Sequence, residues 1–114
     1  MAPLQRLTRR AEFLTVAAGR HKSVAPGLIL QAYPQPAGDA LRVGFTASRR
    51  VGNAVARNRA RRRLRAAAAA VLPAHAAGGH DYVVIARAGT LTRPYEALLD
   101  DLAAGLKRLG VYRG

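Results

Sequence analysis

The sequence predicts a single α+β domain, residues 1–114, in which a small sheet is covered by helices. Three observations lead to this fold class. The length of 114 residues suits one domain with a modest core. Short apolar runs typical of strands lie at residues 28–33, 41–48 and 81–89. Helical periodicity lies before, between and after these runs, so the expected order is helix, strands, helix, strand, helix.

The N-terminal half is expected to hold the first helix and two or three strands. The helix covers residues 9–18, with Thr8 as its N-cap and Gly19 as its stop signal. The segment 21–27 is a candidate edge strand. Pro, Gly and Asp form a turn before residues 41–48. Apolar and polar residues alternate in that stretch, which predicts a half-buried strand in a hairpin with the preceding one.

The C-terminal half is expected to hold two helices around a buried strand. The first is a long basic helix at residues 54–72, and Pro73 ends it. The last helix has Thr92 as its cap, Pro94 in its first turn and Gly110 at its end. Leucines recur along this last helix at intervals of three and four residues, so we expect that face to pack on the sheet.

The charge of the chain predicts a polyanionic partner. Nineteen basic residues stand against six acidic ones, giving a net charge of +13, and residues 40–80 contain no acid. Such an imbalance destabilises a compact protein through self-repulsion, which a polyanion relieves. Nucleic acid is the first candidate and an anionic membrane surface the second. The chain has neither a secretory signal nor an apolar run near the roughly 18 residues of a membrane span, so we expect a soluble, cytoplasmic protein.

The basic helix is amphipathic. At about 100° per residue, one shallow apolar face contains Ala56, Ala60, Leu64, Ala67 and Val71. The remaining surface carries arginines without any acidic residue to compensate them. Like charges at i, i+4 repel, and cations at a helix N-terminus oppose the macrodipole. Solvation alone would explain a mixed-charge face, but an uncompensated one indicates phosphate binding.

The residues from Arg42 to Arg65, RVGFTASRRVGNAVARNRARRRLR, resemble the signature of the bacterial ribonuclease P protein family. In that family a strand leads into Gly-Asn-Ala-Val and then an Arg-Asn-Arg helix, matched here at 52–55 and 57–59. The resemblance extends over nearly the whole chain. It implies an α/β sandwich similar to the second domain of ribosomal protein S5, with three helices and about four strands in a largely antiparallel sheet. It also implies a left-handed βαβ crossover around the basic helix.

The resemblance further implies a function as the protein subunit of ribonuclease P. Such a subunit binds the catalytic ribonuclease P RNA, expected at 1:1, and assists removal of the 5′ leader from precursor tRNA. The RNA subunit is expected to hold the Mg²⁺ of the holoenzyme, with none bound by the protein alone. The residues that match the RNA-facing part of the family are Arg49, Arg50, Asn53, Arg57, Asn58, Arg59, Arg61, Arg62 and Arg65.

A cleft for the single-stranded leader is implied at Phe13, Tyr33 and Arg42. Ala17 stands where many family members have a second aromatic residue, and Ala32 competes with Tyr33 for the place of the strand aromatic. Stacking on an aromatic ring contributes about 1–3 kcal/mol per base. Because this chain has fewer aromatic residues to offer, we expect backbone electrostatics to carry more of the leader contact. A role in the core is an equal alternative for Phe13.

No catalytic or metal site is predicted in the protein itself. Hydrolysis of a phosphodiester by protein requires carboxylates that hold a metal, or an acid–base pair. Asp100 and Asp101 are adjacent on a helix and are expected in solvent on its polar side. The three histidines lie in loops without a carboxylate or thiolate nearby: they are His21, His75 and His80.

Three other functions compete with this interpretation. A general RNA-binding or ribosomal-type protein without a role in cleavage explains the charge but not the motif. A helix-turn-helix DNA-binding protein is disfavoured because the basic helix directly follows a strand. A stand-alone nuclease would have to cleave without RNA.

Overall fold

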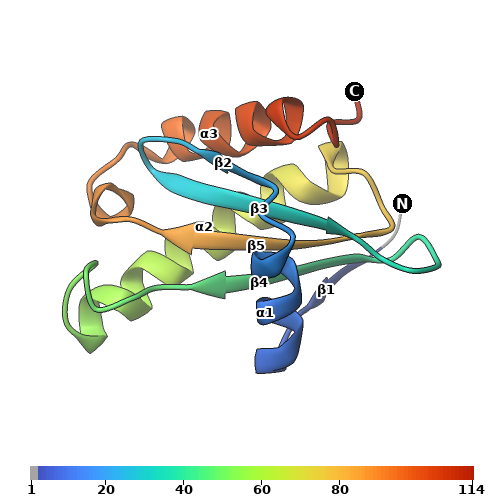
Figure 1. Cartoon of the computed structure of the whole chain (residues 1–114). Coiled ribbons are helices and arrows are strands. Elements are labelled where there is room, and N and C mark those ends of the chain that lie inside the picture. Colours follow the sequence, from blue (N-terminus) through green and yellow to red (C-terminus); the bar gives the residue numbers. More distant parts are fainter. Residues whose placement is uncertain (1–2) are drawn as a thin grey trace.

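One mixed sheet lies between α1 on one face and α2 and α3 on the other (Figure 1). The computed structural model describes residues 3–114. The elements in chain order are β1 (Leu4–Arg6), α1 (Arg10–Ala18), β2 (Lys22–Val24), β3 (Leu28–Pro34), β4 (Leu41–Thr46), α2 (Ala54–His75), β5 (His80–Ala86), the 3₁₀ helix η1 (Ala88–Leu91) and α3 (Tyr95–Arg108).

The sheet has five strands in the order β1-β4-β5-β3-β2. β4 pairs in parallel with β1 and β5, whereas β3 pairs antiparallel with β5 and β2. The α+β class with three α-helices is confirmed. The prediction of about four, largely antiparallel strands is wrong in two respects. The sheet has five strands, and it has as many parallel as antiparallel strand pairs. The additional strand is β1, whose three residues are too few to show a strand periodicity in the sequence.

β5 occupies the centre of the sheet, between β3 and β4, so the predicted hairpin of β3 with β4 is also wrong. The consecutive residues Tyr82, Val83 and Val84 are all buried, although their side chains alternate between the two faces. Such a run is typical of a central strand covered on both sides. α2 connects β4 to its parallel neighbour β5, as expected for the crossover. The left hand of that crossover stays a prediction.

The larger hydrophobic core lies between the sheet and the helices α2 and α3. Full burial of a large apolar side chain contributes about 1.5–3 kcal/mol, so this core fixes both helices on the sheet. Its largest members are Leu28, Leu30, Val43, Leu64, Leu72, Tyr82, Leu98, Leu102 and Leu106. A smaller core lies beneath α1 on the other face, where Leu7, Val16 and Val83 are buried together.

The apolar face predicted for the basic helix is confirmed in α2. Its buried members are Ala60, Leu64, Ala67 and Val71, and Ala56 is half-buried. The predicted end at Pro73 is wrong, because α2 continues to His75 with Pro73 inside the helix. Pro73 has no N–H to donate to the carbonyl of Ala69. Since Ala69 is exposed, water can bind that carbonyl instead, and the proline is tolerated in the last turn.

α1 begins with a different cap from the predicted one. Arg9, not Thr8, is the N-cap residue. The Glu12 carboxylate accepts hydrogen bonds from the backbone N–H groups of Arg9 at 2.9 Å and Thr8 at 3.2 Å. α1 is therefore capped by the carboxylate of a first-turn acid that reaches back to the N–H groups of Thr8 and Arg9, and not by the Thr8 hydroxyl.

α3 begins at Tyr95 with Pro94, not Thr92, as its N-cap residue. The chain forms η1 just before α3, and Thr92 closes that shorter helix instead. Gly110 ends α3 as predicted, with a left-handed φ of 73°. The N–H of Gly110 donates to the Lys107 carbonyl at 3.1 Å, and that of Val111 to the Leu106 carbonyl at 2.9 Å. These two bonds form a Schellman motif.

Asp101 is buried, so the expectation that it is solvated is wrong. Its side chain accepts two hydrogen bonds from Arg93, at 2.6 and 2.9 Å, and one from the Gly27 backbone N–H at 3.0 Å. The Asp101 carboxylate therefore joins three parts of the fold: α3 itself, Arg93 just before it, and the turn between β2 and β3. Its neighbour Asp100 is exposed, as predicted.

Candidate nucleic-acid interface

A tight turn leads from β4 into α2. The N–H groups of Val51 and Gly52 donate to the carbonyls of Ser48 and Arg49, each at 3.1 Å. The Asn53 side chain then accepts from the Ala56 backbone N–H at 2.9 Å, which makes Asn53 the N-cap of α2. Asn53 was predicted to bind RNA, but in the structure its side-chain oxygen caps the helix.

The predicted arginines lie in this turn and along the outer side of α2. Two of them are half-buried and make local contacts. Arg57 donates to the Gly52 carbonyl at 3.0 Å, and Arg61 donates to the Asn58 side chain at 2.5 Å. The others are exposed and make no side-chain hydrogen bond within residues 3–114: they are Arg49, Arg50, Arg59, Arg62 and Arg65. We call these seven arginines the arginine face.

No carboxylate forms an ion pair with the arginine face in the described part of the chain. The three ion pairs there engage only Arg42 and Arg93. The face also surrounds the first turns of α2, where backbone N–H groups and the helix dipole favour an anion. The arginines are thus spread over the solvent side of α2 and the turn at its N-terminus, an arrangement that suits a phosphate backbone.

Arg63 belongs to α2 but not to the arginine face. Its guanidinium donates to the carbonyls of Thr90 at 3.0 Å and Leu91 at 2.9 Å, and also to that of Arg93. Arg63 therefore fixes η1 and the start of α3 against α2. No sequence pattern indicates this role, because Arg63 stands in a run of arginines whose contacts cannot be told apart from the sequence.

Phe13 lies against the sheet at Gly44. A β-carbon at Gly44 would fall 2.4 Å from Cε1 of the ring, so only glycine permits this approach. Phe13 is half-buried, and part of it lines a hollow of about 300 Å³ together with Thr8, Arg10 and Thr46. The ring is thus both a packing residue and a wall of an open groove.

Tyr33 and Arg42 lie in a second hollow, of about 350 Å³, on the other side of α1. Arg42 forms ion pairs with Asp81 at 2.6 Å and Glu12 at 2.9 Å. The hydrogen bonds with Asp81 raise the pKa of Arg42. Backbone N–H groups of Arg9 and Thr8, together with the charge of Arg42, lower the pKa of Glu12. Tyr33 and Arg42 therefore share a hollow that Phe13 does not line, and the charge of Arg42 is already compensated.

A third hollow, of about 430 Å³, was missed by sequence reasoning. It combines apolar and basic groups, lined among others by Ile29, Ile85, Ser48, Arg50 and Arg87. Ile85 pairs with Thr46 in the register of β4 and β5, so this hollow continues the sheet face that Phe13 borders. Alternation along β5 could have placed Ile85 on this face. Nothing in the sequence marks Arg87 as a neighbour of Arg50.

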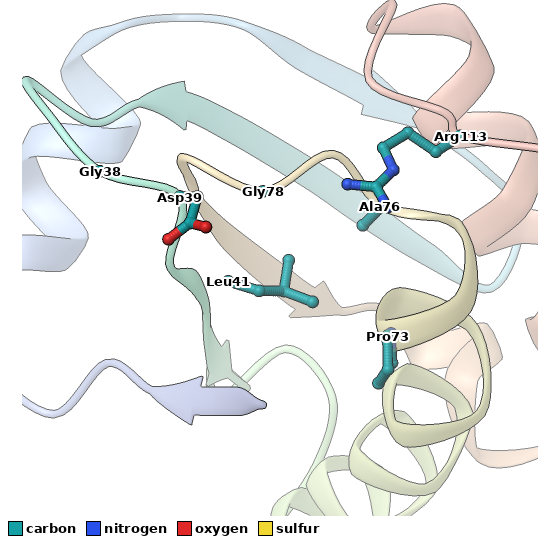
Figure 2. Close-up of a pocket in the computed structure, with 7 residues that line it drawn as sticks. All are labelled: Gly38, Asp39, Leu41, Pro73, Ala76, Gly78 and Arg113. Atoms are coloured by element: carbon teal, nitrogen blue, oxygen red, sulfur yellow. The ribbon is translucent and has the colours of Figure 1, made fainter. Parts of the chain in front are cut away.

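A further cavity, of about 320 Å³, lies where the β3–β4 turn meets the end of α2 (Figure 2). Asp39 and Arg113 are its charged lining residues, and both are exposed. Neither residue lies beside a second acid or base that could form a catalytic pair in this cavity. Across residues 3–114, no group of three or more His, Asp or Glu side chains could hold a metal ion.

An uncompensated arginine face on a firmly packed helix, beside a partly apolar sheet face, defines a basic α+β nucleic-acid-binding protein. None of the helices in residues 3–114 has an apolar stretch long enough to span a bilayer.

The comparisons narrow this class to one family. The sequence matches the Ribonuclease P family over residues 1–110. It is 63% identical over 113 residues to the ribonuclease P protein component of Paramagnetospirillum magneticum. This match covers 96% of this chain and 85% of that protein. It is 48% identical over 106 residues to the ribonuclease P protein component of Gluconacetobacter diazotrophicus, and the match covers 93% of this chain and 91% of that protein. The chain therefore belongs to the ribonuclease P protein family, the protein subunits of the endoribonuclease that processes the 5′ end of tRNA.

Solved structures agree on the fold. The RNase P protein of Staphylococcus aureus superimposes with a TM-score of 0.78 at 24% identity, covering 95% of this chain and 97% of that one. The RNase P protein of Thermotoga maritima gives 0.73 at 22% identity, with coverages of 92% and 94%.

Proposed function

We propose that the arginine face binds the phosphate backbone of a catalytic ribonuclease P RNA in a 1:1 complex. The observation that carries this proposal is the lack of any compensating carboxylate along α2 in residues 3–114. Each exposed guanidinium can donate two parallel hydrogen bonds to a phosphate, and binding relieves the repulsion between the arginines. The buried side of α2 keeps the helix in place, so the backbone that carries the arginine face is ordered before the RNA binds.

We also propose that the precursor tRNA leader runs along the sheet face from Phe13 towards Arg50 and Arg87. This groove offers apolar side chains at Phe13, Ile85 and Ile29 and cations at its far end. Bases can lie on the apolar part while phosphates meet the arginines. Arg42 does not take part directly. Its ion pairs with Glu12 and Asp81 fix α1 on the sheet and so maintain the groove wall.

The chemistry belongs to the RNA in this proposal, and so does the Mg²⁺. The protein supplies positive potential, which lowers phosphate repulsion and favours divalent ions at the RNA active site. We expect the removal of the leader to take place in the cytoplasm, where precursor tRNA is made.

The salt dependence of RNA binding tests the arginine face. Neutralising Arg59, Arg62 or Arg65 one at a time should lower the slope of log K against log salt by about 0.7–0.9 for each lost phosphate contact. Glu96→Gln on the exposed start of α3 is a control that changes charge elsewhere. Unchanged slopes for all three arginine variants would contradict the proposal and leave the face merely solvated.

A general RNA-binding role is the second candidate, since an uncompensated basic face suits any RNA. It predicts the same salt slopes but equal affinity for precursor tRNA and for mature tRNA without a leader.

A further inference from the structure

Arg20 adopts a left-handed backbone conformation, with a φ of 57°. It is the only residue other than glycine with a positive φ in residues 3–114. The β-carbon makes this region unfavourable for most residues, and glycine usually occupies it after a helix. Here glycine stands one position earlier, at Gly19, which has an ordinary φ of −69°. The chain therefore keeps a long basic side chain at a position where glycine would relieve strain.

The segment that follows Arg20 lies beside the end of α3. The His21 ring nitrogen Nε2 lies 3.2 Å from the Leu109 carbonyl oxygen. Arg108 donates to the Val24 carbonyl at 3.2 Å. These two contacts place residues 20–24 beside the end of α3. The two stretches carry four exposed basic residues, which we call the α3-end basic surface: Arg20, Lys22, Lys107 and Arg108. The Lys107 ammonium lies 4.7 Å from the centroid of the Tyr112 ring.

No carboxylate within residues 3–114 forms an ion pair with this surface. The ends of α1 and α3 both lie here, and their dipoles make cations less costly to hold. The helix dipoles explain why four cations are tolerated at this place. They do not explain why Arg20 keeps a left-handed backbone conformation where glycine would be less strained. The surface contains both lysines of the chain, whereas the arginine face contains none. A lysine binds phosphate as a flexible point charge and not through a rigid planar fork.

The surface is separate from the arginine face. α2 begins and α3 ends at opposite ends of the molecule (Figure 1), whose longest dimension is 38 Å. An RNA segment much shorter than this dimension can therefore contact only one of the two surfaces.

We propose that the α3-end basic surface binds the phosphate backbone of a second RNA segment in the ribonuclease P complex, distinct from the one on the arginine face. The inference rests on the proposed function, since it needs RNA already held by α2. RNA is the favoured polyanion because the chain belongs to a family of RNA-processing subunits. An anionic membrane is less suitable, because among residues 3–114 Val24 is the one large apolar side chain exposed next to these cations.

Substitution of Arg20 separates binding from stability. Arg20→Gly relieves the backbone strain, so the urea midpoint of the free protein should rise. The same variant loses a phosphate contact, so the salt slope for holoenzyme RNA should fall by about 0.7–0.9. Arg20→Lys keeps both the charge and the strain, and should keep the slope. Lys22→Gln should lower the slope as Arg20→Gly does, and Lys22→Arg should not.

A tethered probe identifies the RNA segment. The chain contains no cysteine, so Ala104→Cys on the exposed side of α3 and Ala69→Cys on the exposed side of α2 each give one attachment point for an iron chelate. In the holoenzyme with precursor tRNA bound, the probe at position 104 should cleave nucleotides that the probe at position 69 leaves intact. The cleaved strand shows whether the segment belongs to the ribonuclease P RNA or to the tRNA.

Unchanged slopes for Arg20→Gly and Lys22→Gln, with no cleavage from position 104, would overturn this inference. If Arg62→Gln still lowers the slope in that case, the proposed function of the arginine face stands without it. If Arg62→Gln also has no effect, both proposals fail. Loss of binding to phosphatidylglycerol vesicles in the Arg20→Gly variant, with RNA slopes unchanged, would assign the surface to a membrane and likewise overturn it.

Discussion

The ring of Phe13 lies so close to Gly44 that a β-carbon at Gly44 would fall 2.4 Å from Cε1. Because Gly44 is a buried residue in the middle of β4, its backbone cannot easily move away. The contact sets the height of α1 above the sheet, and with it the depth of the groove that we assign to the leader.

We predict that Gly44→Ala displaces Phe13 and destabilises the protein by about 1–3 kcal/mol, the usual cost of overpacking. Phe13→Ala removes the ring instead of displacing it. Replacing a fully buried phenylalanine by alanine costs about 3–5 kcal/mol, because a cavity is left behind. Phe13 is only half-buried, so its loss should cost less, about 2 kcal/mol. Urea denaturation of the free protein measures both effects.

The same two variants test the leader groove. Both should reduce the preference of the holoenzyme for precursor tRNA over mature tRNA, since both change the groove wall. If Phe13→Ala loses stability but keeps the full leader preference, Phe13 is a core residue only.

Arg62 and Arg63 are neighbours in the sequence with opposite expected roles. Arg62→Gln should weaken RNA binding and lower the salt slope by about 0.7–0.9, with little change in stability. Arg63→Gln should leave three backbone carbonyls without their donor and destabilise the protein by about 1–3 kcal/mol, with a near-normal slope once folded. Measuring both properties for both variants checks the assignment. The opposite pattern would mean that the contacts of Arg63 with η1 do not matter for stability.

The pKa of Glu12 lies below its usual value of 4.5, because backbone N–H groups and Arg42 favour the charged form. A lowered pKa in the folded state stabilises the fold above the unfolded value, and this stability is lost as the pH falls through the folded value. The thermal midpoint should therefore fall more steeply below about pH 4.5 in the native protein than in Glu12→Gln. Identical acid profiles would show that the Glu12 contacts contribute nothing to folding.

Asp101→Asn is predicted to destabilise the protein by about 2 kcal/mol or more. Removing one partner of a buried ion pair costs about 3–5 kcal/mol, and the 30% exposure of the Arg93 side chain reduces that figure. Asp100→Asn on the exposed side of the same helix is the matched control and should change little. Equal stability of the two variants would contradict the structural role of Asp101.

The elements that the sequence predicts well are those fixed by long periodic patterns. α2, α3 and the alternating β4 carry strong 3.6- or 2-residue periods, and their buried faces agree with the structure. β1 and η1 have three and four residues, too few for any period, and the pairing of backbones alone decides where they form. The predicted hairpin of β3 with β4 was wrong because β5 lies between these two strands. β5 follows α2 in the chain, and only the three-dimensional packing determines where it enters the sheet.

For the candidate site, the sequence predicts the surface but not the tasks of individual residues. Asn53 caps α2, Arg42 holds two carboxylates and Arg63 binds carbonyls far along the chain. The partner of Asn53 lies in a local turn, whereas those of Arg42 and Arg63 lie 27 to 39 residues away. An arginine or asparagine looks the same in a sequence whatever it contacts. The separation of Arg62 from Arg63 is the clearest case.

The most direct test of the account is cleavage of labelled precursor tRNA at low magnesium by a bacterial ribonuclease P RNA, with and without this protein. We predict that the protein alone cleaves nothing, and that it lets the RNA cut at the mature 5′ end under conditions where the RNA alone is inactive. The Arg62→Gln variant should require more protein or less salt for the same rate. Cleavage by the protein alone, or tight RNA binding without any stimulation of cleavage, would contradict the claim that the arginines support the chemistry of an RNA.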